Sequence, residues 1–550
     1  MMGSGRLNSN APQPRDYQRQ IAGSVLEGKS ALVVLPTGLG KTLIAFIVAE
    51  GMLPKGPVLF CAPTKPLAAQ HYSEAKRLFD LADEEIILVS GEIPAKKRQE
   101  AYPPKNAKAR LVFSTPQTIR NDIGAGRLDW NFSLLVLDEV HRAVGKYAYA
   151  ALAEEAKKNR TLVLGLTASP GSQKKKIEEI TALLGVENVQ IRTLEDADVA
   201  KYAQPLSISY IEVDLPPAME DAKKSLREMM GEKMNTLRKM GFPGKFASKK
   251  ELVAMRAKIL ASRSPLRFSA LSQHSTLFSL SHCLELLETQ GVGTLLKFVQ
   301  KIRERKESKA QLRLLNDARF VRVVEKMKLS GEHPKLERLL VLLKEKQAAN
   351  PALKCIVFCQ YRDQAGLIAK TMQERGMRAN VFMGKKDGIT AQGQKETLEN
   401  FRKGAFDVLV ATSIGEEGLD IPSVDMVVFY EPVPSEIRSI QRRGRAGRAK
   451  VGEIYMLITR GTLDQGFFYA SRKREERMKR IVGRMAGREY APAKTEYSKV
   501  QDAKEDTAQK KQPAKKIEEK KAGDKKNAMK KNEGKKMPSS SKQTTMSDYF

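Results

Sequence analysis

The 550-residue chain contains four cysteines and no run of eighteen apolar residues. Because a helix needs about that many apolar residues to cross the hydrocarbon core of a bilayer, the sequence predicts no membrane span. Cys61 and Cys283 stand alone, and Cys355 and Cys359 lie in the apolar segment KCIVFC, where buried thiols are expected rather than metal ligands. The N-terminus lacks the apolar core of a secretion signal. These absences predict a protein of a reducing, cytoplasmic compartment.

Acidic residues are also in short supply. The chain has 64 Asp and Glu against 96 Lys and Arg, a formal net charge of +32. Residues 221–330 hold 24 Lys and Arg against 10 Asp and Glu, and residues 491–550 hold 16 against 9. A surplus of this size attracts polyanions and predicts nucleic acid as the partner. The basic character is therefore not confined to the tail.

Two series of short apolar segments alternate with helical stretches, the first from residue 31 to about 169 and the second from about 334 to 460. Near-continuous Val, Ile and Leu is typical of strands buried on both faces, and helices between such strands imply parallel sheets. Residues 217–330 show long helical stretches without strand segments. After about residue 486 Lys, Ala, Glu, Gln and Ser dominate without periodicity, which is typical of disorder.

The pattern predicts an α/β fold with two parallel-sheet domains, an all-α insert domain between them and a disordered C-terminal tail. The expected ranges are residues 1–205 for the first domain, 206–330 for the insert, 331–488 for the second domain and 489–550 for the tail.

The segment LPTGLGKT follows the first apolar segment and opens a helical stretch. Gly38 and Gly40 allow the backbone N–H groups to point inward at phosphate oxygens, at the positive end of the next helix. Lys41 can then reach the β- and γ-phosphates, and the Thr42 hydroxyl can coordinate Mg²⁺. The match is partial, because Leu35 stands where the strict pattern has glycine. A simple glycine-rich turn is the alternative.

Two further segments support a nucleotide site. LLVLDEVH places Asp138 and Glu139 at the end of a buried strand, where two carboxylates are costly to desolvate unless they have a function. The Asp can hold Mg²⁺ through water, and the Glu can orient and deprotonate the attacking water. QRRGRAGR, residues 441–448, offers guanidinium groups that can neutralise charge on the γ-phosphate, with a generic basic patch as the alternative. The ordered set favours ATP hydrolysis.

The ordered motifs resemble those of the superfamily 2 helicases over residues 10–485. RDYQ resembles the adenine-reading motif, and TASPG resembles the coupling motif. APTKPLAAQ and STPQTI resemble the motifs that contact the nucleic-acid strand, called here the strand-contacting motifs. In the second domain ATSIGEEGLDIP and QRRGRAGR resemble the fifth and sixth motifs. The resemblance implies two RecA-like domains that use ATP and Mg²⁺.

Within the superfamily, LPTGLGKT, LTASPG, HPKLERL, SIGEEGLDIP and the helical insert are similar to the branch of archaeal Hef, the Fanconi anaemia M translocase, Dicer helicase domains and innate-immune RNA sensors. The strongest resemblance is to archaeal Hef. The resemblance implies that Arg445 and Arg448 are arginine fingers, Gln441 is a γ-phosphate sensor and Asp420 contacts the ribose. It also implies the remaining roles: ATP binding by Arg15, Gln18, Thr37, Gly38, Gly40, Lys41 and Thr42; metal binding by Thr42 and Asp138; catalysis by Lys41, Asp138 and Glu139; and coupling by His141, Thr167 and Ser169.

The sequence departs from the family pattern at two points. DEVH stands where DEAH or DECH is usual, which puts Val140 at a small-residue position and is expected to change packing but not chemistry. Many Hef proteins continue into a nuclease domain with an acidic ERK signature and tandem helix-hairpin-helix motifs. Nothing after Ala491 resembles either, so we expect a helicase-only form without nuclease activity.

The last eight residues, QTTMSDYF, end a lysine-rich segment with a methionine and two aromatic residues. Gln543, Met546, Tyr549 and Phe550 fit Q-x-x-[aliphatic]-x-x-[aromatic]-[aromatic] and resemble the motif that binds the sliding clamp PCNA. One helical turn would place the three apolar side chains on one side as a plug. An accidental aromatic end is the alternative. Clamp binding implies replication or repair and favours a DNA substrate.

The sequence therefore predicts an ATP- and Mg²⁺-dependent DNA helicase or translocase for forked or branched DNA in replication-fork repair, associated with the nucleoid and tethered to the clamp. Its binding to DNA is expected to be indifferent to sequence and steeply dependent on salt. The basic insert is expected to grip a duplex or fork arm, with plain solvated helix faces as the alternative. Two other functions remain open: an ATP-gated switch that binds duplex RNA, and a clamp-recruiting scaffold with weak ATPase activity.

Overall fold

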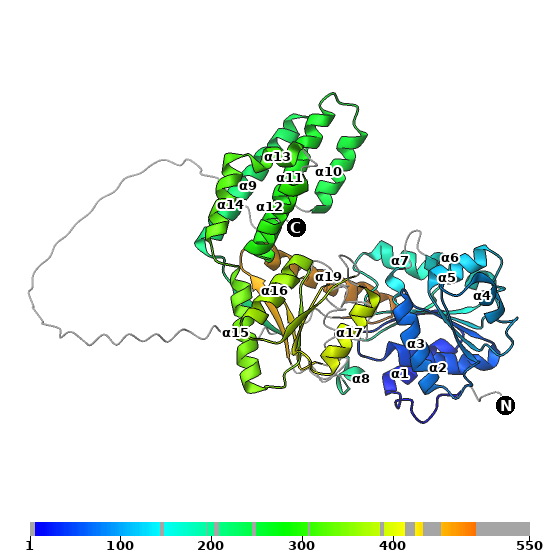
Figure 1. Ribbon diagram of the computed structural model, residues 1–550. Helices are drawn as coiled ribbons and strands as arrows, with labels where there is room; N and C mark the ends of the chain where they lie inside the picture. The colour runs from blue at the N-terminus through cyan, green and yellow to red at the C-terminus, as the bar shows by residue number, and fades with distance from the viewer. Residues whose placement is uncertain are drawn as a thin grey trace, which may run out of the picture.

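The computed structural model describes residues 6–142, 148–194, 196–202, 208–244, 249–305, 309–384, 390–412, 424–432 and 453–490. Figure 1 shows two α/β domains side by side and a bundle of long helices that rises from the second of them. Both sheets are parallel, and the insert lies between the two domains in the chain. The expected fold class is thereby confirmed for the described residues.

The first domain is built on a seven-stranded sheet with the order β3-β4-β2-β5-β6-β1-β7, whose pairs are all parallel. Its strands are β1 (Ala31–Val34), β2 (Val58–Cys61), β3 (Ile86–Val89), β4 (Leu111–Ser114), β5 (Leu134–Leu137), β6 (Leu162–Thr167) and β7 (Asn188–Ile191). The first six coincide with the apolar segments of the sequence. The edge strand β7 was not expected, because its residues are mostly half-buried and mixed in polarity.

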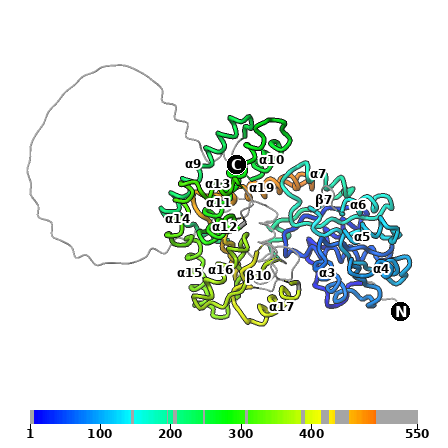
Figure 2. Tube along the Cα trace, turned by 45° about the horizontal axis from the view of Figure 1, so that its top comes forward, coloured from blue at the N-terminus to red at the C-terminus, as the bar shows by residue number. Residues whose placement is uncertain are grey.

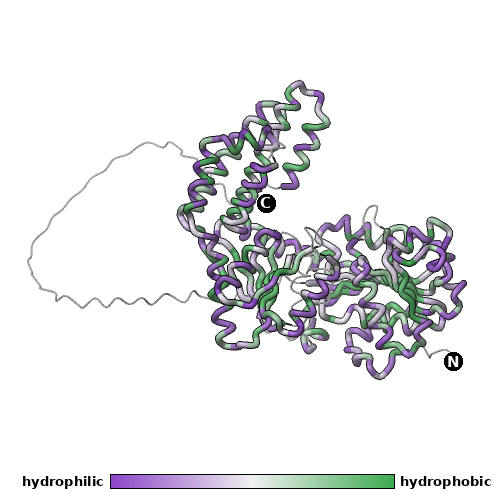
Figure 3. Tube along the Cα trace, viewed as in Figure 1, coloured by the Kyte–Doolittle hydropathy of each residue, from purple (hydrophilic) through white to green (hydrophobic). Residues whose placement is uncertain are grey.

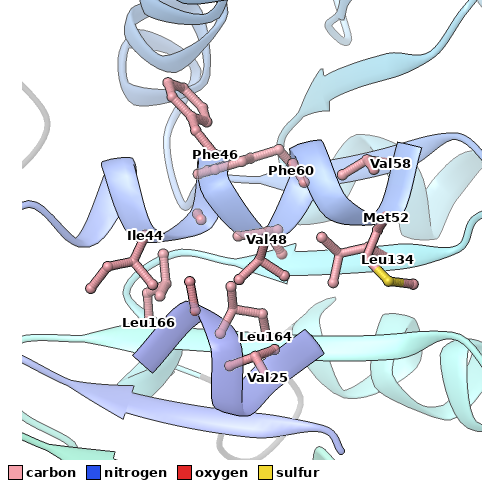
Figure 4. Close-up of a cluster of buried hydrophobic side chains, with 14 of the residues drawn as sticks. Val25, Ile44, Phe46, Val48, Met52, Val58, Phe60, Leu134, Leu164 and Leu166 are labelled. Atoms are coloured by element: carbon pink, nitrogen blue, oxygen red, sulfur yellow. The ribbon is translucent and has the colours of Figure 1, made fainter. Parts of the chain in front are cut away.

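The helices of the first domain cover both faces of this sheet. They are α1 (Asp16–Leu26), α2 (Lys41–Met52), η1 (Leu53–Lys55), α3 (Lys65–Leu78), α4 (Ala95–Ala101), α5 (Pro116–Gly124), η2 (Val140–Arg142), α6 (Ala148–Lys158), α7 (Lys174–Leu183) and α8 (Ala197–Ala200). Figure 4 shows Ile44 and Val48 of α2 against Leu164 and Leu166 of β6, and all four side chains are fully buried. This packing fixes the start of α2 relative to the sheet.

The second domain has a six-stranded sheet with the order β10-β11-β9-β12-β13-β8. Its strands are β8 (Ile208–Val213), β9 (Cys355–Phe358), β10 (Ala379–Phe382), β11 (Val408–Ala411), β12 (Met426–Phe429) and β13 (Glu453–Thr459). Its helices are α15 (Pro334–Ala349), α16 (Arg362–Glu374), α17 (Ala391–Arg402) and α19 (Leu463–Met485). Figure 3 shows that apolar residues are concentrated in the strands of both domains.

Strand β8 precedes the insert in the chain but pairs with β13 in the second sheet. Residues 208–213, which the expected boundary assigns to the insert, therefore belong to the second sheet. The strand was missed because it is an edge strand in which Ser209 and Glu212 interrupt the apolar residues, so that no continuous apolar run forms.

The insert consists of helices packed around one core, as expected. They are α9 (Pro217–Lys239), α10 (Lys249–Ala261), α11 (Arg267–Thr289), α12 (Val292–Arg305), α13 (Lys309–Leu315) and α14 (Ala318–Leu329). The core contains Leu226, Leu237, Leu277, Leu280 and Leu287, all fully buried. Among the described helices of the whole chain, none combines the length and apolar character that crossing a bilayer requires.

The long helix α19 connects the two α/β domains. It begins beside β13 and contacts α11 of the insert, and its other end contacts α7 and β7 of the first domain (Figures 1 and 2). Met478 and Val482 are buried within the core cluster of the first domain. Beyond the helix, the Tyr490 hydroxyl donates to Asp196 at 2.9 Å. The last described segment of the second domain is therefore anchored on the first.

Candidate nucleotide site

The predicted phosphate loop connects β1 to the N-terminus of α2. Gly38 and Gly40 have φ values of +90° and +76°, which a side chain would strain, and they curl the loop over the start of the helix. Lys41 Nζ donates to the carbonyl oxygen of Leu35 at 3.0 Å, so its ammonium lies inside the loop. The N–H of Leu35 donates to the carbonyl of Thr167 at 3.1 Å, which joins the loop to β6. The loop has the geometry of a phosphate cradle.

The adenine-reading segment is tied directly to this loop. Gln18 is 3% exposed, its amide donates to the carbonyl of Leu39 at 3.0 Å, and its Oε1 accepts from the N–H of Arg15 at 2.8 Å. A Cβ on Gly40 would lie 2.3 Å from Gln18 Nε2, so the loop needs glycine there. The Arg15 guanidinium lies over the Tyr202 ring, 5.3 Å from its centroid. Adenine contact by Arg15 and Gln18 stays a prediction.

The acidic pair follows β5, two strands away from the loop. Asp138 is 8% exposed, and its backbone is fixed by the Tyr149 hydroxyl, which donates to its carbonyl, and by its own N–H, which donates to the carbonyl of Cys61 at 2.9 Å. Glu139 has a φ of +50°, a left-handed conformation that costs a non-glycine residue about 1–2 kcal/mol. Strain held at this position is typical of a functional side chain that the surrounding structure orients.

A chain of polar contacts runs from this pair to β6 and on to α19. His141 Nδ1 lies 3.3 Å from Glu139 Oε2 and 3.1 Å from Thr167 Oγ1. The N–H of Ser169 donates to Thr167 Oγ1 at 3.1 Å, and the Ser169 hydroxyl donates to the sulfur of Met478 at 2.9 Å. The structure thus connects the three residues expected to couple hydrolysis, with Thr167 contacting both His141 and Ser169. Their functional role stays a prediction.

Val140, at the position where the family pattern has a small residue, is accommodated by a glycine. It is fully buried, and a Cβ on Gly165 of β6 would lie 3.3 Å from its Cγ1 and 3.0 Å from Leu184. The extra volume of valine therefore fills space that the missing side chain of Gly165 leaves on the neighbouring strand.

The oxygen atoms at this site suit Mg²⁺. Thr42 lies in the first turn of α2, and the carboxylate of Asp138 lies at the end of β5, with β6 between β5 and β1. Mg²⁺ prefers oxygen ligands and keeps several waters, so one carboxylate and one hydroxyl beside substrate phosphates are a fitting set. Within the described residues, no cluster of three His, Cys, Asp or Glu side chains forms a metal site.

Two contacts to the predicted residues had no counterpart in the motifs. His71 of α3 contacts the Asp138 carboxylate, and Met478 of α19 contacts Ser169. His71 directly follows the strand-contacting segment APTKPLAAQ, but nothing in the sequence indicates what its ring touches. Met478 is 309 residues from its partner in the chain. Only the folded structure could reveal either contact.

Several expected residues lie outside the described residues. These are Asp420, Gln441, Arg445 and Arg448 of the second domain and Gln543, Met546, Tyr549 and Phe550 of the tail. Thr37 lies half-buried in the loop. The roles predicted for these nine residues stay predictions.

Two RecA-like domains in one chain, with the phosphate loop and acidic pair in the first, are the organisation of superfamily 2 helicases. Three family models match the chain accordingly: DEAD/DEAH box helicase over residues 15–177, helicase conserved C-terminal domain over residues 334–450 and, over residues 218–333, the helical bundle of a provisionally assigned ATP-dependent RNA helicase. The expected enzyme class, an ATP-hydrolysing superfamily 2 helicase, is confirmed at the level of the family.

The comparisons with individual proteins point the same way. The crystal structure of the Pyrococcus furiosus Hef helicase domain matches with a TM-score of 0.67 and 40% identity, over 84% of this chain and 98% of that one. A Methanocaldococcus jannaschii protein provisionally named an ATP-dependent RNA helicase is 38% identical over 86% of this chain and 61% of its own length. The Schizosaccharomyces pombe ATP-dependent DNA helicase fml1 is 32% identical over 81% of this chain and 57% of its own. The chain belongs to the Hef family of helicases.

Proposed function

We propose that the chain is an ATP-driven DNA helicase or translocase that acts on forked or branched DNA. The observation that carries this proposal is the continuous arrangement on β5, β6 and β1: the acidic pair, the coupling residues and the phosphate loop lie at adjacent strand ends and contact one another. ATP bound in the loop would lie beside the coupling residues, of which Ser169 contacts Met478 of α19 in the second domain. Hydrolysis could then change the relation between the two domains.

In the proposed reaction, Lys41 exchanges its bond to Leu35 for a phosphate oxygen, and Glu139 orients and deprotonates the attacking water. Mg²⁺, when bound by Thr42 and Asp138, neutralises charge on the phosphates. Arg445 and Arg448 would complete the site from the second domain, with Gln441 and Asp420 contacting the γ-phosphate and the ribose.

The choice of DNA is supported by the names of several relatives. The fungal proteins mph1 and fml1 and Drosophila melanogaster Fancm, at 31–32% identity, are named ATP-dependent DNA helicases. The chain spans 61% of the Methanocaldococcus relative and 41% of the Neurospora crassa relative, so activity and substrate are part of the proposal.

The tip of the insert has the chemistry of a nucleic-acid contact. Arg256 and Lys258 of α10 are exposed, and within the described residues no carboxylate forms an ion pair with them. Helix α11 packs against α10, and near its start Phe268 is 72% exposed, with the Arg267 guanidinium 4.7 Å from its ring centroid. Cations attract phosphates and an exposed aromatic ring can stack on a base, so we propose that this surface grips a fork arm.

Replacing Arg256 and Lys258 by glutamine should flatten the dependence of fork affinity on salt. The slope of log K against log salt is negative, and each phosphate that the protein no longer neutralises makes it less steep by about 0.9. The slope of the double variant should therefore be less steep by up to about 1.8. Fluorescence anisotropy with a labelled fork at four salt concentrations measures this slope. The matched control replaces Arg319 and Lys326, which form ion pairs with Glu232 and Asp221. Equal slopes for both variants and the unchanged protein would leave the insert as scaffold.

We also propose that the C-terminal QTTMSDYF tethers the enzyme to a sliding clamp. A chain ending at Lys542 should lose binding to PCNA in a pull-down or titration, because Gln543, Met546, Tyr549 and Phe550 would form the whole plug. Its unwinding of free forks should remain unchanged, since these residues lie beyond both α/β domains. Clamp binding by the shortened chain would contradict the assignment.

The second candidate function is an ATP-gated grip on duplex RNA. It is favoured by the RNA names of the helical-bundle model and of the Methanocaldococcus relative. Labelled DNA and RNA forks of identical shape, incubated with ATP, distinguish the two. Arm displacement or exchange on DNA only supports the proposed function, whereas retention of RNA without strand separation supports the RNA switch.

A further inference from the structure

A buried histidine lies directly beside the acidic pair. His71 of α3 is 5% exposed, and its Nε2 lies 3.1 Å from Oδ2 of Asp138. Its ring packs against Phe60 of β2, with the centroids 4.7 Å apart. Its other nitrogen, Nδ1, is buried and has no hydrogen-bond partner within the described residues. A buried polar ring with a single polar contact is uncommon, and here that contact is the carboxylate expected to hold the metal.

The direction of this hydrogen bond follows from the partner. An ionised carboxylate only accepts, so Nε2 of His71 donates to Oδ2. The other oxygen, Oδ1, accepts from the N–H of Glu139 at 3.0 Å. Each oxygen of Asp138 is therefore held by one donor and keeps a lone pair for water or a metal ion. Within the described residues no Lys or Arg forms an ion pair with Asp138, so the hydrogen bond orients the carboxylate without competing for its charge.

His71 also shares a helix with the strand-contacting segment. Helix α3 is continuous from Lys65 to Leu78 and packs on β3 and β4. Its first turn is capped by Thr64, whose hydroxyl accepts from the N–H of Leu67 at 3.5 Å. At 1.5 Å per residue, His71 lies about 9 Å along the helix from Lys65. If binding of a nucleic-acid strand shifted the capped end of α3, the helix would move as a rigid body and His71 would move with it.

We propose that His71 is a positioning residue: it fixes the Asp138 carboxylate for Mg²⁺ and links that carboxylate, through α3, to the nucleic-acid strand. The inference rests on the proposed function, because it requires the nucleic-acid substrate to contact the N-terminal end of α3. Nucleic-acid binding would then strengthen metal binding without any direct contact between the two ligands.

The test compares His71→Leu, which removes the donor at similar volume, with His71→Gln, whose amide nitrogen can reach the position of Nε2. Electron paramagnetic resonance titration with Mn²⁺, in the presence of a nonhydrolysable ATP analogue, measures metal affinity on the full chain. His71→Leu should weaken Mn²⁺ binding about 10- to 100-fold, the usual effect of losing a partner of a metal ligand. His71→Gln should stay within about threefold of the unchanged protein.

The same titration with forked DNA tests the link through α3. DNA should strengthen Mn²⁺ binding in the unchanged protein and in His71→Gln, and it should have no such effect in His71→Leu. A lower thermal midpoint for His71→Leu with unchanged Mn²⁺ affinity would show a purely structural role and overturn the proposal. Equal weakening in both variants would also overturn it, because the ring and not the donor would then matter.

Failure of this inference can be told apart from failure of the proposed function. Mn²⁺ binding with the analogue requires no hydrolysis, so it reports on His71 even if turnover is absent. An unchanged protein that binds Mn²⁺ and the analogue but is not stimulated by DNA would count against the proposed function alone.

Discussion

Replacing Lys41 by alanine is expected to lower the kcat of ATP hydrolysis by about 10²- to 10³-fold, the usual cost of removing one preorganised charge at a transition state. Lys41 Nζ lies inside a loop whose shape depends on Gly38 and Gly40, so alanine should remove the ammonium and leave the loop. Glu139→Gln should be similarly inactive, because the amide cannot deprotonate the water. Steady-state phosphate release with saturating forked DNA measures both effects.

Two controls make this result interpretable. Both variants should bind forked DNA as the unchanged protein does, because neither side chain belongs to the insert. Lys108→Ala makes the same change at an exposed surface pair with Glu84 and should leave kcat unchanged. Retained turnover in both site variants would contradict the assignment of the site and would favour a scaffold whose function is independent of ATP.

Replacing Lys335 by methionine is expected to lower the free energy of unfolding by about 3–5 kcal/mol, the usual cost of leaving a buried charge unpaired. Lys335 and Asp464 are both fully buried, and Lys335 Nζ lies 2.7 Å from Asp464 Oδ2. The ammonium also donates to the carbonyl of Thr289 and lies 4.8 Å from the centroid of the Tyr430 ring. The ion pair joins α15 to the start of α19 within the second domain. The hydrogen bond to Thr289 connects the same buried ammonium to the end of α11 in the insert.

The loss of stability in Lys335→Met should depend on pH through Asp464. Burial raises the pKa of Asp464, and the charge of Lys335 opposes that rise, so the pKa should rise further in Lys335→Met. A raised pKa means that the folded state binds the proton of Asp464 more tightly than the unfolded state does. The loss of unfolding free energy is therefore full above the pKa of the folded state. It disappears as the pH falls towards the pKa of the unfolded chain, near 3.9. Urea unfolding at pH 7 and pH 4.5 should therefore show a smaller defect at the lower pH.

The double variant Lys335→Met/Asp464→Asn serves as the control for this pair. Removing both charges avoids the unpaired carboxylate, so the variant should be more stable than Lys335→Met alone at pH 7. A double variant less stable than the single one, or a defect independent of pH, would show that the packing of Lys335 and not its charge matters.

The positions of the loop and of the acidic pair could be predicted because each follows a short, continuously apolar strand. In a parallel sheet such strands are buried and their carboxyl ends lie at one edge, and the structure places Lys41, Asp138 and Thr167 at that edge. The edge strands β7 and β8 carry no such signal, since polar residues interrupt them and only Ile191 and Ile211 are fully buried.

The contacts that connect distant parts of the chain were not predictable. HPKLERL was recognised as a motif, yet the sequence does not indicate that Lys335 pairs with Asp464, 129 residues later. The same holds for Met478 against Ser169 and for His71 against Asp138. Each of these contacts depends on how helices pack against the sheets, and periodicity within one segment does not determine that.

The most direct test of the central claim is steady-state ATPase activity with no nucleic acid, single-stranded DNA, forked DNA or duplex RNA, each at two salt concentrations. A Hef-like enzyme for branched DNA predicts the strongest stimulation by forked DNA, with a loss of stimulation at the higher salt. Strongest stimulation by duplex RNA, or equal activity under all four conditions, would contradict that claim.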